Sequence, residues 1–392
     1  MKTKTWKINK LEEVCEILDN KRIPISQKNR IKGIYPYYGA SGIVDYIDKY
    51  IFDEELVLIG EDGAKWGAFE NSAFIVNGKY WVNNHAHILK PNNEILINKF
   101  LVYFLNYSNL EKYITGATVK KLNQQKLKQI EIPLPPLKEQ ERIVGILDES
   151  FSKIDESIKI LEQDLLNLDE LMQSALQKAF NPLKDNAKEN YKLPQGWEWK
   201  SLGEISNLIQ NGFAASKNNE IPSGYVHLRT HNISTDGNLN FDTLIKIKRE
   251  FIKEKQSFIE KNDILFNNTN STELVGKTAL VTQNYNYAFS NHLTKIKLKN
   301  QYNSKLVVFY FVLLLKNKYF EKICHQWIGQ SGINIDKLKK IQIPLPPLKE
   351  QEQIASHLDE LSSHVKNLKQ NYQAQIKDLQ ELKNSLLDKA FK

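Results

Sequence analysis

The ten residues IPLPPLKEQE occur twice, as Ile132–Glu141 and as Ile343–Glu352, and each copy leads into a long helical pattern. The same spacing relates the pairs Ala179-Phe180 and Ala390-Phe391 further along. Ten consecutive identities are too many for chance, so the chain is a tandem duplication. A chain built as domain, helix, domain, helix is expected to engage a target that itself has two related halves.

Weaker landmarks extend the repeat through each half. Trp6-Lys7 corresponds to Trp199-Lys200, and Asn84-His85 corresponds to Asn291-His292. The loops between the landmarks diverge almost completely. The pattern indicates one fold that is present twice, with loops of different sequence in each copy.

The segment after each motif copy is predicted to be a long helix. The prolines of the motif favour an extended lead into a helix start, and Glu139 and Glu141 place negative charge near its amino end. Apolar residues then follow the 4-3 spacing of a coiled coil, at Ile154, Ile158, Leu161, Leu165, Leu168, Met172, Ala175 and Ala179, and at Val365, Leu368, Tyr372, Ile376, Leu379, Leu382, Leu386 and Ala390.

The charges of the two helices are complementary. Residues 153–180 hold 3 Lys and 6 acidic residues, whereas residues 364–391 hold 5 Lys and 3 acidic residues. We therefore expect the helices to pair with each other as an antiparallel coiled coil. The alternative is that each helix joins a different partner.

Each globular part is predicted to be α+β, with short strands, turn-rich loops and a closing helix. The expected strands are 55–60, 72–76, 80–82, 87–90, 225–228, 263–266, 278–282 and 293–299, and the expected helices are 98–107 and 304–316. The predicted architecture is pseudo-two-fold. Its parts are a first globular domain at 1–131, a helical spacer at 132–180, a linker at 181–196, a second globular domain at 197–342 and a second helical spacer at 343–392.

Composition restricts the class of protein. The longest apolar run, Leu306–Leu315, is about half the roughly 20 residues that a membrane helix needs, so it predicts a buried helix. Two cysteines without metal-type spacing fit a reducing cytoplasm. The net charge is +8, and it is concentrated in the globular parts: residues 1–131 hold 19 basic and 15 acidic residues, and residues 190–342 hold 21 and 12. This distribution favours a polyanion partner, with a merely solvated lysine surface as the alternative.

Signals for catalysis are scarce. The sequence has no phosphate-binding Gly-rich loop, no GxSxG and no HExxH. The pair His85-x-His87 lacks a third ligand at metal spacing. Residues 60–65 resemble a nuclease carboxylate–lysine cluster, but their counterpart from Asn267 has only neutral polar residues. We predict no catalytic, cofactor-binding or metal-binding residue.

The loops instead carry side chains that contact base edges and phosphates. Turn formation and tyrosine packing are the structural alternatives for these residues. The candidate DNA-binding residues are Tyr37, Tyr38, Ser41, Lys65, Trp66 and His85 in the first half, and Arg229, His231, Asn232, Asn267, Asn268, Thr269, Asn270, Ser271 and His292 in the second.

With the duplicated motif and its helices, almost the whole chain resembles the specificity subunit of Type I restriction-modification enzymes. The opening of the second half, LPQGWEWKSLG from Leu193, also looks like the usual start of a recognition domain in that family.

The resemblance implies a non-catalytic subunit in which each domain reads one half of a split double-stranded DNA target. It implies that the paired helices dock two methyltransferase subunits, to which restriction and translocase subunits add. S-adenosylmethionine, ATP and Mg are then expected in the partner subunits and not in this chain. A methyltransferase or nuclease with an unrecognised active site, and a coiled-coil scaffold, are the alternatives.

Overall fold

The computed structural model describes residues 6–180, 193–252 and 258–392, so the predicted linker at 181–196 lies mostly outside the described residues. The chain forms two compact units, Met1–Glu162 with Tyr372–Lys392, and Gln163–Asn371. The boundary between the units crosses both long helices, α4 (Leu137–Phe180) and α9 (Leu348–Phe391). Each unit thus contains one globular domain and a segment of each helix.

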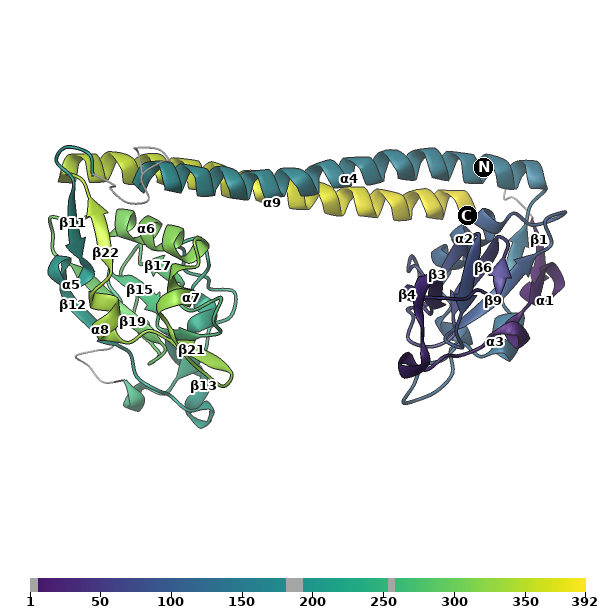
Figure 1. Cartoon of the computed structure of the whole chain (residues 1–392), viewed down its shortest axis with the longest axis horizontal. Helices are drawn as coiled ribbons and strands as arrows, with labels where there is room; N and C mark the ends of the chain where they lie inside the picture. The colour runs from purple at the N-terminus through teal and green to yellow at the C-terminus, as the bar shows by residue number, and fades with distance from the viewer. Residues whose placement is uncertain (1–5, 181–192, 253–257) are drawn as a thin grey trace. The chain divides into compact units, whose positions relative to one another are not determined.

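Unit 1 is built on two four-stranded sheets, with strand orders β2-β9-β6-β7 and β4-β3-β8-β5, and on a ribbon of β1 and β10. Helix α2 packs on β7 and β6 (Figure 1). The elements are β1 (Lys7–Lys10), α1 (Leu11–Val14), β2 (Cys15–Ile17), β3 (Lys32–Gly39), β4 (Gly42–Ile47), β5 (Phe52–Asp53), β6 (Leu56–Gly60), β7 (Ala73–Val76), β8 (Lys79–Val82), β9 (Ala86–Pro91), α2 (Asn98–Tyr107), α3 (Gln124–Lys128) and β10 (Glu131–Leu134).

Unit 2 repeats this plan, with a sheet of order β12-β19-β15-β17, a ribbon of β11 and β22, and α6 packed on β17. Two three-stranded sheets, β14-β13-β18 and β16-β21-β20, complete it. The elements are β11 (Glu198–Ser201), α5 (Leu202–Ile205), β12 (Ser206–Asn211), β13 (Glu220–Leu228), β14 (Lys246–Ile247), β15 (Ile264–Asn267), β16 (Thr269–Asn270), β17 (Thr278–Leu280), β18 (Ala288–Phe289), β19 (Leu293–Leu298), α6 (Ser304–Lys316), α7 (Tyr319–Ile323), β20 (His325–Trp327), β21 (Gln330–Gly332), α8 (Ile335–Lys339) and β22 (Gln342–Leu345).

Every strand expected from the sequence has a counterpart, and α2 and α6 have the predicted bounds. The apolar run within α6 is a buried helix, as predicted. No helix of the described part of the chain is long and apolar enough to span a membrane. The hairpin of β3 and β4 was not predicted, because several of its apolar side chains face solvent and obscure the alternation: Ile34 is 79% exposed and Val44 is 54% exposed.

The repeated motif joins each domain to its helix in the same way twice. Its first residues form β10 and β22, which pair antiparallel with β1 and β11. In the first copy the buried Gln140 side chain donates to the carbonyls of Pro135 and Ile95, both at 2.8 Å, and accepts from the Ile97 amide at 2.9 Å.

The second copy repeats this clasp. The Gln351 side chain donates to the Pro346 carbonyl at 2.8 Å and accepts from the Asn303 amide at 2.9 Å. In both units the glutamine therefore ties the first turn of the long helix to the loop that precedes α2 or α6.

The long helices pair antiparallel, as expected. In unit 1 an early residue of α4, Asp155, forms an ion pair with a late residue of α9, Lys383. In unit 2, Asp169, which follows Asp155 along α4, lies 2.7 Å from Lys369, which precedes Lys383 along α9. Figure 1 shows the two helices side by side within each unit.

The eleven residues predicted for the interface are all buried or half-buried. Three are buried, namely Ile154, Leu168 and Val365. The others are half-buried, namely Ile158, Leu161, Leu165, Met172, Tyr372, Ile376, Leu379 and Leu386. Two further positions of the second heptad pattern, Leu368 and Leu382, are 40% and 44% exposed. The 4-3 pattern of α9 therefore places two of its leucines outside the packed seam.

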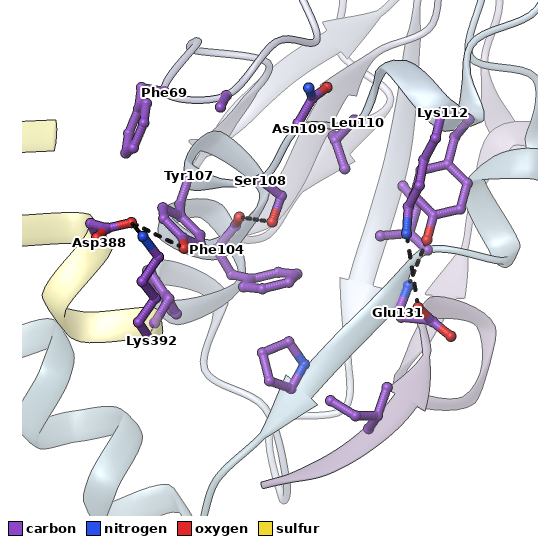
Figure 2. A pocket seen from close by; sticks show the side chains of 16 residues that line it. Phe69, Phe104, Tyr107, Ser108, Asn109, Leu110, Lys112, Glu131, Asp388 and Lys392 are labelled. Atoms are coloured by element: carbon purple, nitrogen blue, oxygen red, sulfur yellow. Dashed lines mark hydrogen bonds and ion pairs between the residues drawn. The ribbon is translucent and has the colours of Figure 1, made fainter. Parts of the chain in front are cut away.

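The last turn of α9 packs against α2 beside a pocket of about 780 Å³ (Figure 2). The Tyr107 hydroxyl donates to Asp388 at 3.4 Å, and the Tyr107 ring stacks on Phe391 with centroids 5.2 Å apart. None of the predicted DNA-binding residues lines this pocket. It belongs to the junction of domain and helix.

We predict that Gln351→Leu lowers the free energy of unfolding by about 1–3 kcal/mol, because it leaves the Asn303 amide and the Pro346 carbonyl without their partner. Urea titration followed by circular dichroism measures the loss. The matched control is Gln353→Leu, an exposed glutamine two residues along the same helix, for which a change within about 0.5 kcal/mol is expected. Equal losses in the two variants would show that the clasp contributes nothing.

Candidate nucleic-acid interface

Three segments of unit 1 that carry candidate residues meet at one edge of the domain, where β3, β6 and β8 end. Tyr37 and Tyr38, which were expected in a loop, lie within β3 itself. The Asn83 amide donates to the Tyr38 carbonyl at 3.0 Å, and the Glu61 amide donates to the His85 carbonyl at 2.8 Å. Gly60 approaches the first loop so closely that an added Cβ would lie 2.9 Å from the Ala40 carbonyl oxygen. Backbone contacts alone therefore bring these loops together.

Unit 2 has the same arrangement at the ends of β13, β15 and β18. The Ser290 amide donates to the Leu228 carbonyl at 3.0 Å, and the Asn268 amide donates to the His292 carbonyl at 3.0 Å. Lys277, which is buried, adds a bond from its ammonium to the Thr230 carbonyl at 2.9 Å. The two units thus share a backbone framework for loops of unrelated sequence.

Two of the six candidates in unit 1 are interior residues. Tyr37 is 1% exposed, and its hydroxyl accepts from the Ile25 amide at 3.0 Å. Trp66 is 6% exposed, and its indole N–H donates to the Gly60 carbonyl at 3.0 Å. The structure therefore places Tyr37 and Trp66 beneath the loops, as supports.

The other four candidates of unit 1 reach the surface. Ser41, Lys65 and His85 are exposed, and Tyr38 is half-buried. The His85 ring lies 2.5 Å from an Asp62 carboxylate oxygen, and the Lys65 ammonium lies 3.8 Å from Glu70. These side chains are available at the loop surface but already have anionic neighbours.

Three candidates of unit 2 are also interior: Asn232, Asn267 and Asn268 are at most 6% exposed. The Asn232 side chain donates to the Asn240 and Thr243 carbonyls, both at 2.9 Å, and accepts from the Arg229 amide at 2.8 Å. The remaining six lie at the surface: His231, Ser271 and His292 are exposed, and Arg229, Thr269 and Asn270 are half-buried.

A buried ionic trio that sequence reasoning did not identify lies under the loops of unit 1. His87 is fully buried, and its Nδ1 lies 2.6 Å from Asp19 and 3.7 Å from Glu61. Its Nε2 lies 2.6 Å from the Leu122 carbonyl oxygen. Both ring nitrogens of His87 therefore face oxygen acceptors, a carboxylate on one side and a backbone carbonyl on the other.

Further charges complete this cluster. Glu61 pairs with Arg22 and with Lys121, the latter at 2.8 Å. Burial raises the pKa of Asp19, but hydrogen bonds from His87 and Gln124 and the charges of His87 and Arg22 outweigh burial and hold that pKa below its usual value.

Asp19, Glu61 and His87 also have the composition and spacing of a metal-ligand group, since their ligand atoms lie within 4.8 Å of one another. Both ring nitrogens of His87 are already engaged, however, and the two carboxylates face Arg22 and Lys121. A cation would have to displace these partners. We assign the trio a structural role in fixing the loops.

Unit 2 has a neutral trio in the same place. Asn268 donates from its side-chain amide to the Thr294 hydroxyl at 2.9 Å, and that hydroxyl donates to Oδ1 of the Asn211 side chain at 2.6 Å. Asn268 and Thr294 occupy the positions of Glu61 and His87, because they make the corresponding backbone contacts. The sequence signal that could have revealed both trios is this alignment of polar residues between the repeats.

Several buried polar atoms near the candidate loops of unit 2 have no hydrogen-bond partner among the residues that the structure describes, which is uncommon in folded proteins. They are His227 Nδ1, Arg229 Nε, Asn267 Oδ1 and Ser290 Oγ. The Arg229 guanidinium donates to the Ala215 carbonyl at 3.1 Å and lies 3.6 Å from Glu220. These four atoms are shielded from solvent, although the Arg229 side chain as a whole is partly exposed.

The pKa of His227 is lowered to about 4, first by burial and then by the charge of Arg229. Because the folded-state pKa lies below the usual value of about 6.5, the unfolded state binds more protons between these two pH values.

We predict that the free energy of unfolding falls as pH drops from 6.5 towards 4, with a loss from His227 of at most about 3 kcal/mol. His227→Gln should flatten this dependence in urea titrations at a series of pH values. The control is His231→Gln, which changes an exposed histidine four residues away. A wild-type slope in the His227 variant would contradict the assignment.

The sequence matches the Type I restriction modification DNA specificity domain twice, over residues 3–166 and 194–378. A putative Type I restriction enzyme specificity subunit of Haemophilus influenzae is 30% identical over 366 residues, which cover 91% of this chain and 87% of that protein. The Type I restriction enzyme EcoBI specificity subunit of Escherichia coli is 25% identical over 306 residues, covering 71% of this chain and 61% of that protein.

Solved structures share the fold. A chain from a structure that concerns complex assembly and conformational transition of the Type I R-M system superposes with a TM-score of 0.74 at 19% identity, covering 100% of this chain and 98% of that one. The HsdS subunit of Thermoanaerobacter tengcongensis gives a TM-score of 0.54 at 20% identity, with 99% and 97% covered. The predicted class, two α+β domains with two long helices, is confirmed.

The two family matches together extend over most of the sequence, and the Haemophilus influenzae relative is similar along most of both chains. The resemblance inferred from the repeated motif is therefore confirmed. The chain belongs to the family of Type I restriction-modification DNA specificity subunits, which are non-catalytic.

Proposed function

We propose that this chain selects the DNA target of a Type I restriction-modification complex, and that each domain reads one half of a bipartite site. The observation that carries the proposal is the repeated loop framework. The same two backbone hydrogen bonds hold the loops in both units, while the side chains displayed there differ. Two similar domains with different surface groups suit a target of two different halves.

The charge distribution supports a DNA partner. The basic excess lies in the globular parts, and in unit 2 partly buried donors such as Arg229 lie beside the loops. Lysines on such a surface bind phosphates irrespective of sequence, whereas side chains at the strand ends discriminate bases. The proposed functional modules are residues 1–131 and 197–342 for recognition, 132–180 and 343–392 as helical spacers, and 181–196 as linker.

We assign the paired helices as the docking surface for two methyltransferase subunits, with restriction and translocase subunits joining through the complex. Apolar side chains remain exposed after the helices pair, among them Ile160 at 55% and Leu166 at 58%. In unit 2 an apolar groove of about 540 Å³ lies between the helices, lined by residues that include Leu171, Ala175 and Ile354. Such a surface on a helix pair suits further helices of a partner.

S-adenosylmethionine, ATP and Mg would be bound by those partner subunits. A protein that selects targets in cellular DNA works where that DNA lies, and on this ground we propose a cytoplasmic location.

The hypothesis that each domain recognises one half of the target has a direct test. Residues 1–131 are exchanged for the first domain of a related specificity subunit, and the hybrid is expressed with its methyltransferase subunits. Mapping of methylated adenines across the genome should show one half of the target changed and the other half retained. A hybrid that folds but changes both halves would show that recognition is shared between the domains.

At the level of single residues, Arg229→Ala should weaken binding to the cognate duplex by roughly tenfold to a hundredfold and barely affect random duplex, as expected for a lost base contact. Lys217→Ala, which removes an exposed lysine of the same domain, should weaken both duplexes equally and reduce the salt slope by about one unit. Paired titrations at fixed salt measure both effects. Equal losses on both duplexes for Arg229→Ala would make Arg229 a phosphate contact.

A further inference from the structure

A short hairpin stands beside the recognition loops of unit 2, and none of its residues was among the sequence candidates. It consists of β20 and β21, which pair antiparallel from His325↔Gly332 to Trp327↔Gln330. Its turn residue Gly329 has a φ of 84°, a conformation that glycine adopts without strain. We call residues 325–332 the tip hairpin of unit 2 (Figure 1).

The tip hairpin is fastened to the candidate loop that follows β15. Strand β21 pairs with β16, which places Ser331 opposite Asn270. The Ser331 hydroxyl lies 2.9 Å from the Thr272 hydroxyl, and the Ile333 amide donates to the Asn268 carbonyl at 2.9 Å. A duplex that contacts the loop would therefore meet the hairpin as well.

The end of this hairpin is apolar and held in place. Ile328 is fully exposed and Trp327 is 54% exposed. The Trp327 ring lies against the Gly332 backbone, since a Cβ added to Gly332 would be 2.8 Å from it, and it makes an edge contact with His325 at 4.8 Å between centroids. Single exposed apolar residues are ordinary on protein surfaces. Trp327 and Ile328, however, stand together on a hairpin that is anchored beside the polar candidate residues.

Unit 1 has a hairpin in the same place with a different end. Thr115 and Lys121 exchange backbone bonds of 2.9 and 2.8 Å, and the Leu122 amide donates to the Glu61 carbonyl at 2.8 Å, which matches the Ile333–Asn268 bond. Its exposed end carries Thr118, Val119 and Lys120 and has no aromatic residue. We call residues 115–121 the tip hairpin of unit 1. The two tip hairpins share the same backbone contacts, but their exposed ends carry different side chains.

We propose that Trp327 and Ile328 form an apolar wedge that contacts the bases of the half-site read by unit 2 and opens one base step. This inference rests on the proposed function. Apolar side chains inserted at a step unstack the bases and kink the duplex, and an aromatic face stacks on any base. Lys322 and Lys337 are exposed nearby in the chain and can pair with phosphates, although each stands next to an acidic residue, Glu321 or Asp336.

The wedge predicts that the protein distinguishes DNA sequences by how easily their base steps unstack. Steps of a pyrimidine followed by a purine unstack more easily than others. A half-site with such a step facing the hairpin should be preferred, even where no side chain makes hydrogen bonds to those bases. Unit 1, whose tip hairpin ends in Val119 and Lys120, should distort its own half-site less.

The test uses the full chain and the cognate duplex identified from the methylation map, with 2-aminopurine placed in turn at each step of the two half-sites. The wild-type protein should brighten the probe at one step of the half-site read by unit 2. The double variant Trp327→Ala with Ile328→Ser should abolish that signal and weaken cognate binding roughly tenfold. Trp327→Phe, which retains an aromatic face, should restore most of both.

The matched control is Val119→Ser in the tip hairpin of unit 1, which should leave the unit 2 signal unchanged. A double variant that binds and brightens the probe like the wild type overturns the wedge. Retained DNA binding together with impaired assembly with methyltransferase subunits also overturns it, in favour of a protein contact. Failure of the wild type to distinguish cognate from random duplex would instead refute the proposed function itself.

Discussion

A buried glutamine holds each globular domain to its long helix, and the rest of the architecture depends on this contact. Gln140 and Gln351 are at most 3% exposed, and their side-chain amides bond to backbone groups on both sides of the junction. A glutamine amide offers donors and an acceptor together, so one side chain can satisfy the helix lead and the preceding loop. Because each unsatisfied backbone group would be costly in the interior, the helix leaves its own domain in a defined direction.

The loop framework explains how such a fold tolerates different recognition surfaces. The bonds that bring the loops together join backbone amides to backbone carbonyls, and these groups are present whatever the side chains are. The side chains beneath are free to differ, as the ionic trio around His87 and the neutral trio around Thr294 show. Specificity can therefore change while the domain keeps its strands and its connection to the helix.

In the mode of recognition that we propose, phosphate binding and base reading use different parts of the surface. A basic excess spread over each domain draws in the phosphate backbone without selecting a sequence. Selection requires donors, acceptors and apolar groups held at fixed positions, and the strand ends and the tip hairpins supply such positions. Anchoring matters because a base contact discriminates only if its geometry is maintained.

The sequence by itself determined the duplication, the α+β class, the principal strands and both long helices, and it favoured their antiparallel pairing over separate partners. These features follow from local periodicity, proline placement and charge, all of which depend on residues close together in the sequence. It also located the loops that converge, but it did not distinguish Tyr37, Trp66 and Asn267, which are buried, from their exposed neighbours. Only the tertiary structure decided that, because burial depends on strands distant in sequence. The trio of Asp19, Glu61 and His87 likewise exists only when three separate segments fold together.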